Sequence, residues 1–162
     1  MSNLNSEHLR VVIEAVNCCP FFQHMSMKIT NLDIGYARVV MDIGVQHMNP
    51  FGGPHGGVYA SVIDTAAFWS AYCDLAVDKG LISLDLNVDF LAPASCERIF
   101  IVGKRIKAGK TISLAEATMF NSREKILAHG TSKLMVTRST QSMNDVFKQS
   151  GSDNLPPKFL GG

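Results

Sequence analysis

The residues best suited to chemistry lie in the segment 49–72, NPFGGPHGGVYASVIDTAAFWSAY. Asp64 is the only ionisable carboxylate between Val58 and Cys73, and apolar residues and alanines surround it on all sides of a predicted helix. Most of this helix must therefore be buried. A buried carboxylate has to be paired, or it stays protonated with a raised pKa. Asp64 is thus a candidate functional residue, and an aspartate facing solvent at the helix rim is the structural alternative.

The pair Gly56-Gly57 opens the same helix. The first backbone N–H groups of a helix have no partner within it, and they point along the positive end of its dipole. Because glycine has no side chain, a ligand can approach these groups closely. Two such donors can stabilise a carbonyl oxygen that gains negative charge.

Asp64 lies about two turns beyond these glycines, roughly 10–12 Å along the axis at ~1.5 Å per residue. It cannot reach a carbonyl held at the N-terminus of its own helix. If both features act on one substrate, Asp64 must come from a second subunit. We therefore expect the site at a dimer interface.

Two other kinds of site are disfavoured by the same loop. Gly52 and Gly57 have the spacing of a phosphate-binding loop, but Val58-Tyr59 follows where Lys-Ser/Thr is needed. The dinucleotide fingerprint is absent from this loop, and no βαβ unit surrounds it. The histidines show no spacing typical of metal ligands. We expect neither a nucleotide triphosphate site nor a metal.

Hydrophobic periodicity predicts the elements that position these residues. The N-terminal half contains a short amphipathic helix, stopped near Pro20, then two strands and a long apolar helix, at Ser6–Asn17, Ser26–Asn31, Tyr36–Ile43 and Gly56 to about Val77.

The remainder of the chain is typical of strands. Apolar and polar residues alternate from Leu84 to Phe90, which predicts a half-buried strand, and Pro93 interrupts it. Three more strands on hairpin-length connections follow, at Arg98–Lys107, Thr111–Phe120 and Lys125–Val136.

Consecutive strands on short turns make an antiparallel sheet, and its apolar face needs a cover. The helix from Gly56 is the only predicted element long and apolar enough for this. We therefore predict an α+β fold with a curved antiparallel sheet wrapped around a central helix. The predicted divisions are an N-terminal lead-in (1–22), the domain (23–138) and a flexible polar C-terminal tail (139–162).

Composition limits the environment of the protein. The 162 residues are enough for one domain with a real core, and 46% are hydrophobic. With 15 basic and 14 acidic residues the net charge is +1, which favours no nucleic-acid partner. We find no secretory signal, no apolar run long enough to span a bilayer, and four cysteines without a CxxC pair. A cytoplasmic protein without a membrane partner is expected.

Together these residues resemble a known family. Asn49, then His55-Gly56-Gly57, then Asp64-Thr65-Ala66 resembles the signature of hotdog-fold acyl-CoA thioesterases of the PaaI type. LDLNVDFLAPA (84–94) resembles the strand that follows the central helix in that family. The resemblance covers Met27 to about Thr137.

The resemblance implies a role for each residue around the carbonyl of a thioester. The backbone N–H of Gly56 or Gly57, helped by the Asn49 side chain, would polarise the carbonyl. His55 would stabilise the loop or the substrate end of the site. These implied roles agree with the physical reading of the helix N-terminus.

The resemblance also implies the reactive groups. Asp64 of the partner subunit would act as general base on water or as nucleophile, and Ser83 would orient the attacking water. By alternation, however, Ser83 shares a face with Asp85, opposite Leu84. It can meet Asp64 only if another subunit covers that face or the strand is bent there, and a solvent-facing serine is the alternative.

The implied substrate is an acyl-CoA with a small or medium acyl group, including an aromatic one, hydrolysed to free acid and CoA. Phe51 and Tyr59 are placed to touch it. Lys107 or Lys110 would bind the CoA phosphates, although charges near hairpins are usually only solvated. No cofactor is implied beyond the CoA of the substrate. The implied assembly is a homodimer or a homotetramer, a dimer of dimers.

Two alternatives remain open on the same fold. An enoyl-CoA hydratase or dehydratase would use His55 with Asp64 on the α and β carbons of the substrate. A non-catalytic acyl-CoA-binding module would use the same pocket without chemistry, since a fold does not determine a function.

Overall fold

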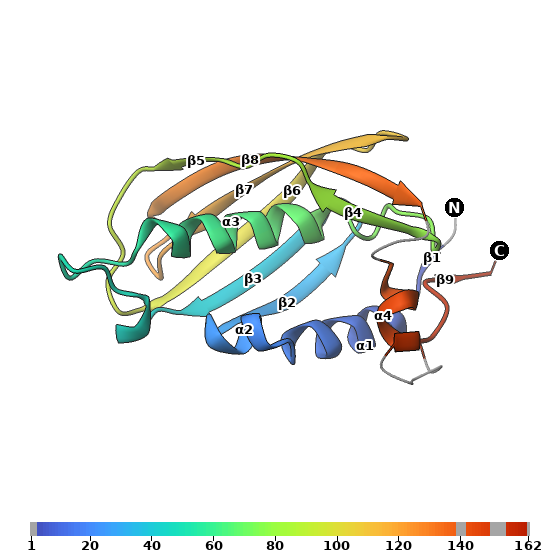
Figure 1. Ribbon diagram of the computed structural model, residues 1–162, viewed down its shortest axis with the longest axis horizontal. Coiled ribbons are helices and arrows are strands. Elements are labelled where there is room, and N and C mark those ends of the chain that lie inside the picture. Colours follow the sequence, from blue (N-terminus) through green and yellow to red (C-terminus); the bar gives the residue numbers. More distant parts are fainter. Residues whose placement is uncertain (1–2, 139–141, 150–154, 162) are drawn as a thin grey trace.

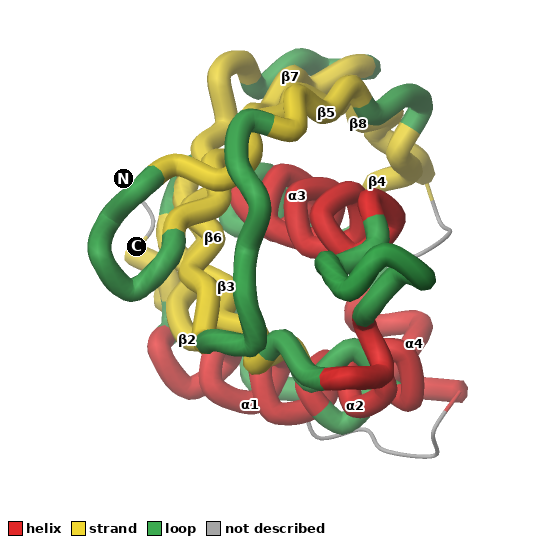
Figure 2. Tube along the Cα trace, turned by 90° about the vertical axis from the view of Figure 1, so that its left-hand side faces the viewer, coloured by secondary structure: helices red, strands yellow, loops and turns green. Residues whose placement is uncertain are grey.

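The computed structural model describes residues 3–138, 142–149 and 155–161. A strongly curved antiparallel sheet wraps around one helix, α3 (Gly56–Ser70), as Figure 1 shows. Seen from the side in Figure 2, the sheet passes α3 on two sides. The predicted α+β architecture is confirmed.

All seven strands of this sheet pair antiparallel, in the order β2-β3-β6-β7-β8-β4, and β5 also pairs with β8. Their bounds are β2 Met27–Asp33, β3 Tyr36–Asp42, β4 Lys79–Ser83, β5 Asn87–Phe90, β6 Arg98–Lys107, β7 Ile112–Phe120 and β8 Ile126–Arg138. Within the described residues, β4 and β5 form one free edge of the sheet and β2 forms the other.

Two glycines let α3 lie unusually close to the sheet. A Cβ atom at Gly103 of β6 would lie 2.0 Å from the backbone oxygen of Ala66. A Cβ atom at Gly130 of β8 would lie 2.5 Å from the Asn87 oxygen and 2.7 Å from the Ile63 side chain. Any other residue would push the helix or the neighbouring strand away. The close approach holds α3 at a fixed height over the sheet and buries Ile63 and Ala66 completely.

The N-terminal prediction is confirmed for α1, which spans Ser6–Asn17 and packs along β2. Pro20, however, starts a second helix, α2 (Pro20–His24), as well as ending the first. Proline suits the first position of a helix because its missing N–H would have no partner there. A short 3-10 helix, Val45–His47, leads into the glycine-rich loop.

The central helix is shorter than predicted. It ends at Ser70, where the sequence pattern suggested about Val77, and turns follow. The carbonyl oxygens of Tyr72 and Leu75 in these turns accept hydrogen bonds from the buried Lys158 ammonium, at 2.6 and 2.7 Å. A contact from 83 or more residues away is invisible to local periodicity.

The predicted flexible tail is wrong for the described residues of the C-terminal segment. Residues Met143–Gln149 form α4, and β9 (Phe159–Leu160) pairs with β1 (Asn3–Leu4). In this arrangement the Lys158 side chain is buried, and only 2% of the residue is exposed. The polar composition of the segment suggested that it would be surrounded by solvent. Its few apolar residues and Lys158 instead pack against the domain. The three-part division of the chain stays a prediction.

The predicted strand from Leu84 to Phe90 is two strands. β4 ends at Ser83, β5 begins at Asn87, and the residues between them leave regular pairing. Leu84 and Phe90 are 51% and 59% exposed, so the expected burial of this face is not achieved within one chain. Across the described ranges, we find no helix that is both long and apolar enough to cross a membrane.

Candidate active site

Asp64 and Ser83 meet within one chain. Ser83 is the last residue of β4, beside the middle of α3, and its hydroxyl donates a hydrogen bond of 2.9 Å to Asp64 Oδ1. The two line an open pocket of about 320 Å³ with Ala60, Ser61, Leu84, Asp85 and Leu86. Ser83 is itself exposed, so it meets Asp64 without cover from a second subunit.

The environment of Asp64 favours a reactive carboxylate. Burial raises its pKa above the usual aspartate range, and the hydrogen bond from Ser83 partly offsets this. Its second oxygen, Oδ2, has no hydrogen-bond partner among the described residues. Asp64 thus lines a pocket and combines raised basicity with an acceptor atom that no described residue occupies, which are the properties that a general base requires.

At the N-terminus of α3, only one of the two predicted glycine N–H donors is free of a partner among the described residues. His55 is the N-cap, and its Nδ1 accepts the Gly57 N–H at 2.9 Å. The Gly56 N–H has no acceptor among the described residues. Of the two predicted donors, Gly56 is therefore the one left available to a ligand, and His55 acts as the cap that stabilises the loop.

Asn49 is committed to its own loop. Its Oδ1 accepts the N–H groups of Phe51 and Gly53 at 2.9 and 3.3 Å, and its Nδ2 donates to Pro54 O at 3.5 Å. Gly52 within this loop has φ +82°, a conformation that side chains disfavour. Asn49 shapes the loop that leads into α3, and the predicted contact of its side chain with substrate stays a prediction.

A second pocket, of about 300 Å³, lies at the N-terminus of α3. Its walls include Gly56, Tyr59 and Phe90. The Tyr59 hydroxyl accepts the Ala94 N–H at 2.7 Å, so this ring is a fixed wall of the pocket. Phe51, by contrast, is 95% exposed at the tip of the loop and lines neither pocket.

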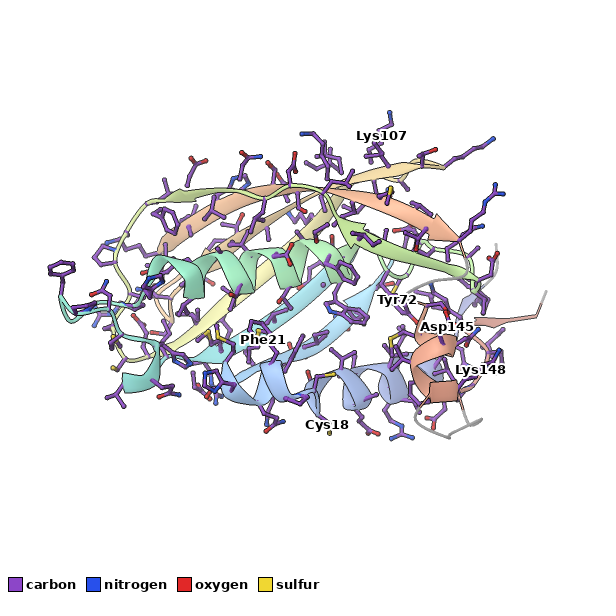
Figure 3. All side chains as sticks on the ribbon, viewed as in Figure 1. Cys18, Phe21, Tyr72, Lys107, Asp145 and Lys148 are labelled. Carbon is purple, nitrogen blue, oxygen red and sulfur yellow. The ribbon has the colours of Figure 1, made fainter. Side chains whose placement is uncertain are left out.

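The predicted phosphate-binding lysines lie away from both pockets. Lys107 ends β6 and Lys110 lies in the following hairpin, and both are exposed. Figure 3 shows Lys107 projecting from the side of the sheet opposite α3. Their role toward CoA stays a prediction.

Sequence reasoning missed several residues that line the pocket beside Asp64. Ser61 lies one turn before Asp64, and its hydroxyl is bonded to the Gly57 carbonyl oxygen at 2.7 Å. Helical spacing from Asp64 could have found it. Leu84 and Leu86 could not be found that way, because simple alternation places them opposite Ser83.

Comparisons with known proteins find similarity to thioesterases. The family model described as thioesterase superfamily matches residues 51–128. The sequence is 28% identical over 129 residues to acyl-coenzyme A thioesterase 13 of Mus musculus, covering 77% of this chain and 91% of the relative. It is 25% identical over 103 residues to 1,4-dihydroxy-2-naphthoyl-CoA hydrolase of Listeria monocytogenes, covering 64% and 84%.

Solved structures share the fold at lower sequence identity. A thioesterase from Haemophilus influenzae superposes with a TM-score of 0.77 at 19% identity, covering 87% of this chain and 98% of its own. The E. coli PaaI protein from the phenylacetic acid degradation operon gives a TM-score of 0.75 at 19% identity, covering 86% and 99%.

Proposed function

We propose that this chain is a thioester hydrolase of the thioesterase superfamily and that it hydrolyses small or medium acyl-CoA thioesters, with Asp64 as the reactive carboxylate. The observation that carries the proposal is the Asp64–Ser83 pair. The Asp64 carboxyl has a raised pKa, lines a pocket, and has one oxygen bonded to Ser83 and the other without a partner among the described residues.

In the proposed reaction, Asp64 takes a proton from a water molecule as the water oxygen attacks the thioester carbonyl. The carbonyl oxygen gains negative charge and accepts a hydrogen bond from the Gly56 N–H at the positive end of α3. When the C–S bond breaks, CoA leaves as the thiolate and takes up the proton that Asp64 removed from the water, which restores the Asp64 carboxylate, and the acid is released. Direct attack by the Asp64 carboxylate on the carbonyl is the variant of this scheme in which water enters one step later.

A second subunit completes the site in this proposal. Gly56 and Asp64 lie on one helix, roughly 12 Å apart along its axis. The β4–β5 edge beside them is free within the described residues, and it carries the exposed apolar side chains of Leu84, Phe90 and Leu91, at 51, 59 and 58%. Two copies that pair antiparallel along this edge would set Asp64 of one opposite the helix N-terminus of the other.

The first experiment measures thiol release from a panel of aromatic, short, medium and long acyl-CoAs. We expect release from at least one small or medium member. Loss of the enoyl absorbance without thiol release would instead indicate a hydratase, and tight binding with neither change would indicate a binding module. Either result would contradict the proposal.

A subunit-mixing experiment tests the shared site. Asp64→Ala removes the carboxylate, and Gly56→Leu covers the Gly56 N–H, at a position where a Cβ makes only ordinary contact with Phe90 at 3.5 Å. Each variant alone should be inactive. Refolded together, they should recover roughly a quarter of wild-type activity, because half of the random dimers carry one intact site. An inactive mixture that contains heterodimers would place both groups in one chain.

A further inference from the structure

A β-bulge separates β4 from β5. Ser83 pairs with Leu134 of β8, and Asn87 pairs with Thr131. Between these two pairs the edge strand has three residues (84–86), whereas β8 has two (132–133), so the edge strand contains one extra residue. An extra residue reverses the alternation of side chains beyond it.

This reversal lets Ser83 and Val88 of β5 face the same side of the sheet. In an unbroken strand, Ser83 and Val88 would lie on opposite faces because their positions differ by an odd number. With the bulge, Ser83 contacts Asp64 of α3, and Val88 lies opposite Gly130, against which Ile63 of α3 also packs. Both residues thus face the central helix, which an unbroken strand would not allow.

Asp85, in the middle of the bulge, ties it to β8. Its Oδ1 accepts the backbone N–H of Lys133 at 2.9 Å, and its Oδ2 accepts the Lys133 ammonium at 2.5 Å. Its backbone oxygen accepts the Ser132 hydroxyl at 2.8 Å. A bulge leaves a ladder N–H without its usual carbonyl partner, and here the Asp85 carboxylate takes that place.

We propose that Asp85 is a positioning residue of the active site: its carboxylate holds the bulge that keeps the Ser83 hydroxyl on Asp64. The proposal rests on the function proposed above, in which Asp64 is the reactive group. The role belongs to the bond between the Asp85 carboxylate and the Lys133 backbone N–H, and the exposed ion pair with the Lys133 ammonium adds little to it.

The consequence can be measured at Asp64. Burial raises the pKa of this carboxyl and the Ser83 hydroxyl lowers it. The other charged group that lines the pocket is Asp85 itself, held by Lys133. If the bulge relaxes and Ser83 turns away, the ionised form of Asp64 loses a hydrogen bond. Its pKa then rises, and the acid limb of the activity profile moves to higher pH.

The test compares Asp85→Ala with Ser83→Ala in the full-length protein. We expect both variants to raise the Asp64 titration midpoint, followed by carboxyl NMR, and to move the acid limb of kcat/KM upward. Activity at neutral pH should fall about 10- to 100-fold in each, as for the loss of a hydrogen bond to a charged group. The double variant should shift no further than Ser83→Ala alone.

Two conservative variants separate positioning from charge. Asp85→Asn keeps an oxygen for the Lys133 N–H and should return the titration and the rate profile close to wild type. Lys133→Met removes the ion pair but keeps the backbone N–H that Asp85 binds, and it should behave like wild type. Asp85→Ala that leaves the Asp64 titration unchanged while Ser83→Ala shifts it would overturn the proposal, as would Ser83→Ala without a shift.

If Asp85→Ala does not fold, Asp85→Glu takes its place, since it keeps the charge and displaces the carboxylate by one methylene group. The same upward shift is then required, and its absence overturns the proposal. The NMR titration needs no turnover. It therefore reports on Asp85 even if an active Asp64→Asn variant were to contradict the proposed reaction.

Discussion

The middle of α3 holds a half-buried carboxyl and the turns after its C-terminus contact a buried ammonium, and the two groups differ in their partners and in the space beside them. Asp64 in the middle has one hydroxyl partner, one free oxygen and an open pocket. Lys158 at the end is 2% exposed, and its ammonium donates to the carbonyl oxygens of Tyr72 and Leu75.

The surroundings of Lys158 are those of a structural contact. The ammonium also lies 4.1 Å from the centre of the Tyr72 ring, and the Tyr72 hydroxyl is bonded to His8 Nε2 at 2.7 Å. Tyr72 lies between the end of α3 and α4 (Figure 3). The lysine thereby joins the C-terminal segment, the end of the central helix and α1.

Burial moves both groups toward their neutral forms. It raises the pKa of Asp64 and lowers the pKa of Lys158 to about 8. A shifted pKa therefore does not identify a reactive group by itself. The distinguishing features are an unoccupied polar atom and space beside it, which Asp64 has and Lys158 lacks.

The largest expected effect is on activity at Asp64. Asp64→Asn should lower kcat ~10²–10⁴-fold, the range for loss of a positioned general base, while the protein stays folded. The measurement is thiol release with the best acyl-CoA of the panel. Asp78→Asn, the same change at an exposed carboxyl in the turns after α3, is the matched control and should keep its activity. Equal rates in the two variants would remove Asp64 from the mechanism.

Lys158 should affect stability instead. Lys158→Ala should lower the free energy of unfolding by ~2–4 kcal/mol, because two buried carbonyl oxygens lose their donor and each such loss costs ~1–3 kcal/mol. Urea denaturation measures this, with the exposed Lys148→Ala on α4 as control. Activity of the folded variant should stay within a few-fold of wild type. A drop as large as that of Asp64→Asn would break the distinction between the two regions.

The pH dependence of stability should carry the Lys158 signature. Between pH 8 and 10.5 the folded state has released this proton while the unfolded state still binds it, so wild-type stability rises with pH relative to Lys158→Ala. The gain over this window should reach about 3 kcal/mol. Denaturation at several pH values tests it, and a flat difference would mean that Lys158 titrates normally.

The smallest effect should be the stability change at Asp64, with the opposite sign. Because its folded pKa is raised, the folded state binds more protons than the unfolded state above the normal aspartate range, and stability falls as pH rises through this interval. Asp64→Asn should therefore be more stable than wild type at neutral pH and lose this advantage in acid. Thermal unfolding at pH 7 and near pH 3.5 provides the comparison. A variant less stable than wild type at pH 7 would show that Asp64 serves the fold.

Local patterns predicted those parts of the fold in which each residue is placed by its near neighbours. The bounds of α1 and β6 agree with the helical and alternating patterns at Ser6–Asn17 and Arg98–Lys107. Local patterns also predicted the start of α3 at Gly56 and Asp64 as a candidate functional residue. Periodicity is sufficient there because one face of each element is buried.

The sequence alone determined a buried carboxylate on a central helix, a glycine opening to that helix, and a sheet that must cover it. Only the tertiary structure decided that Ser83 donates to Asp64, that the His55 side chain accepts the Gly57 N–H, and that Lys158 binds the turns after the helix. Each of these depends on a register, a cap or a contact between segments distant in the chain. One extra residue at the bulge reverses the facing of the strand, and no pattern of alternation can reveal which residue is the extra one.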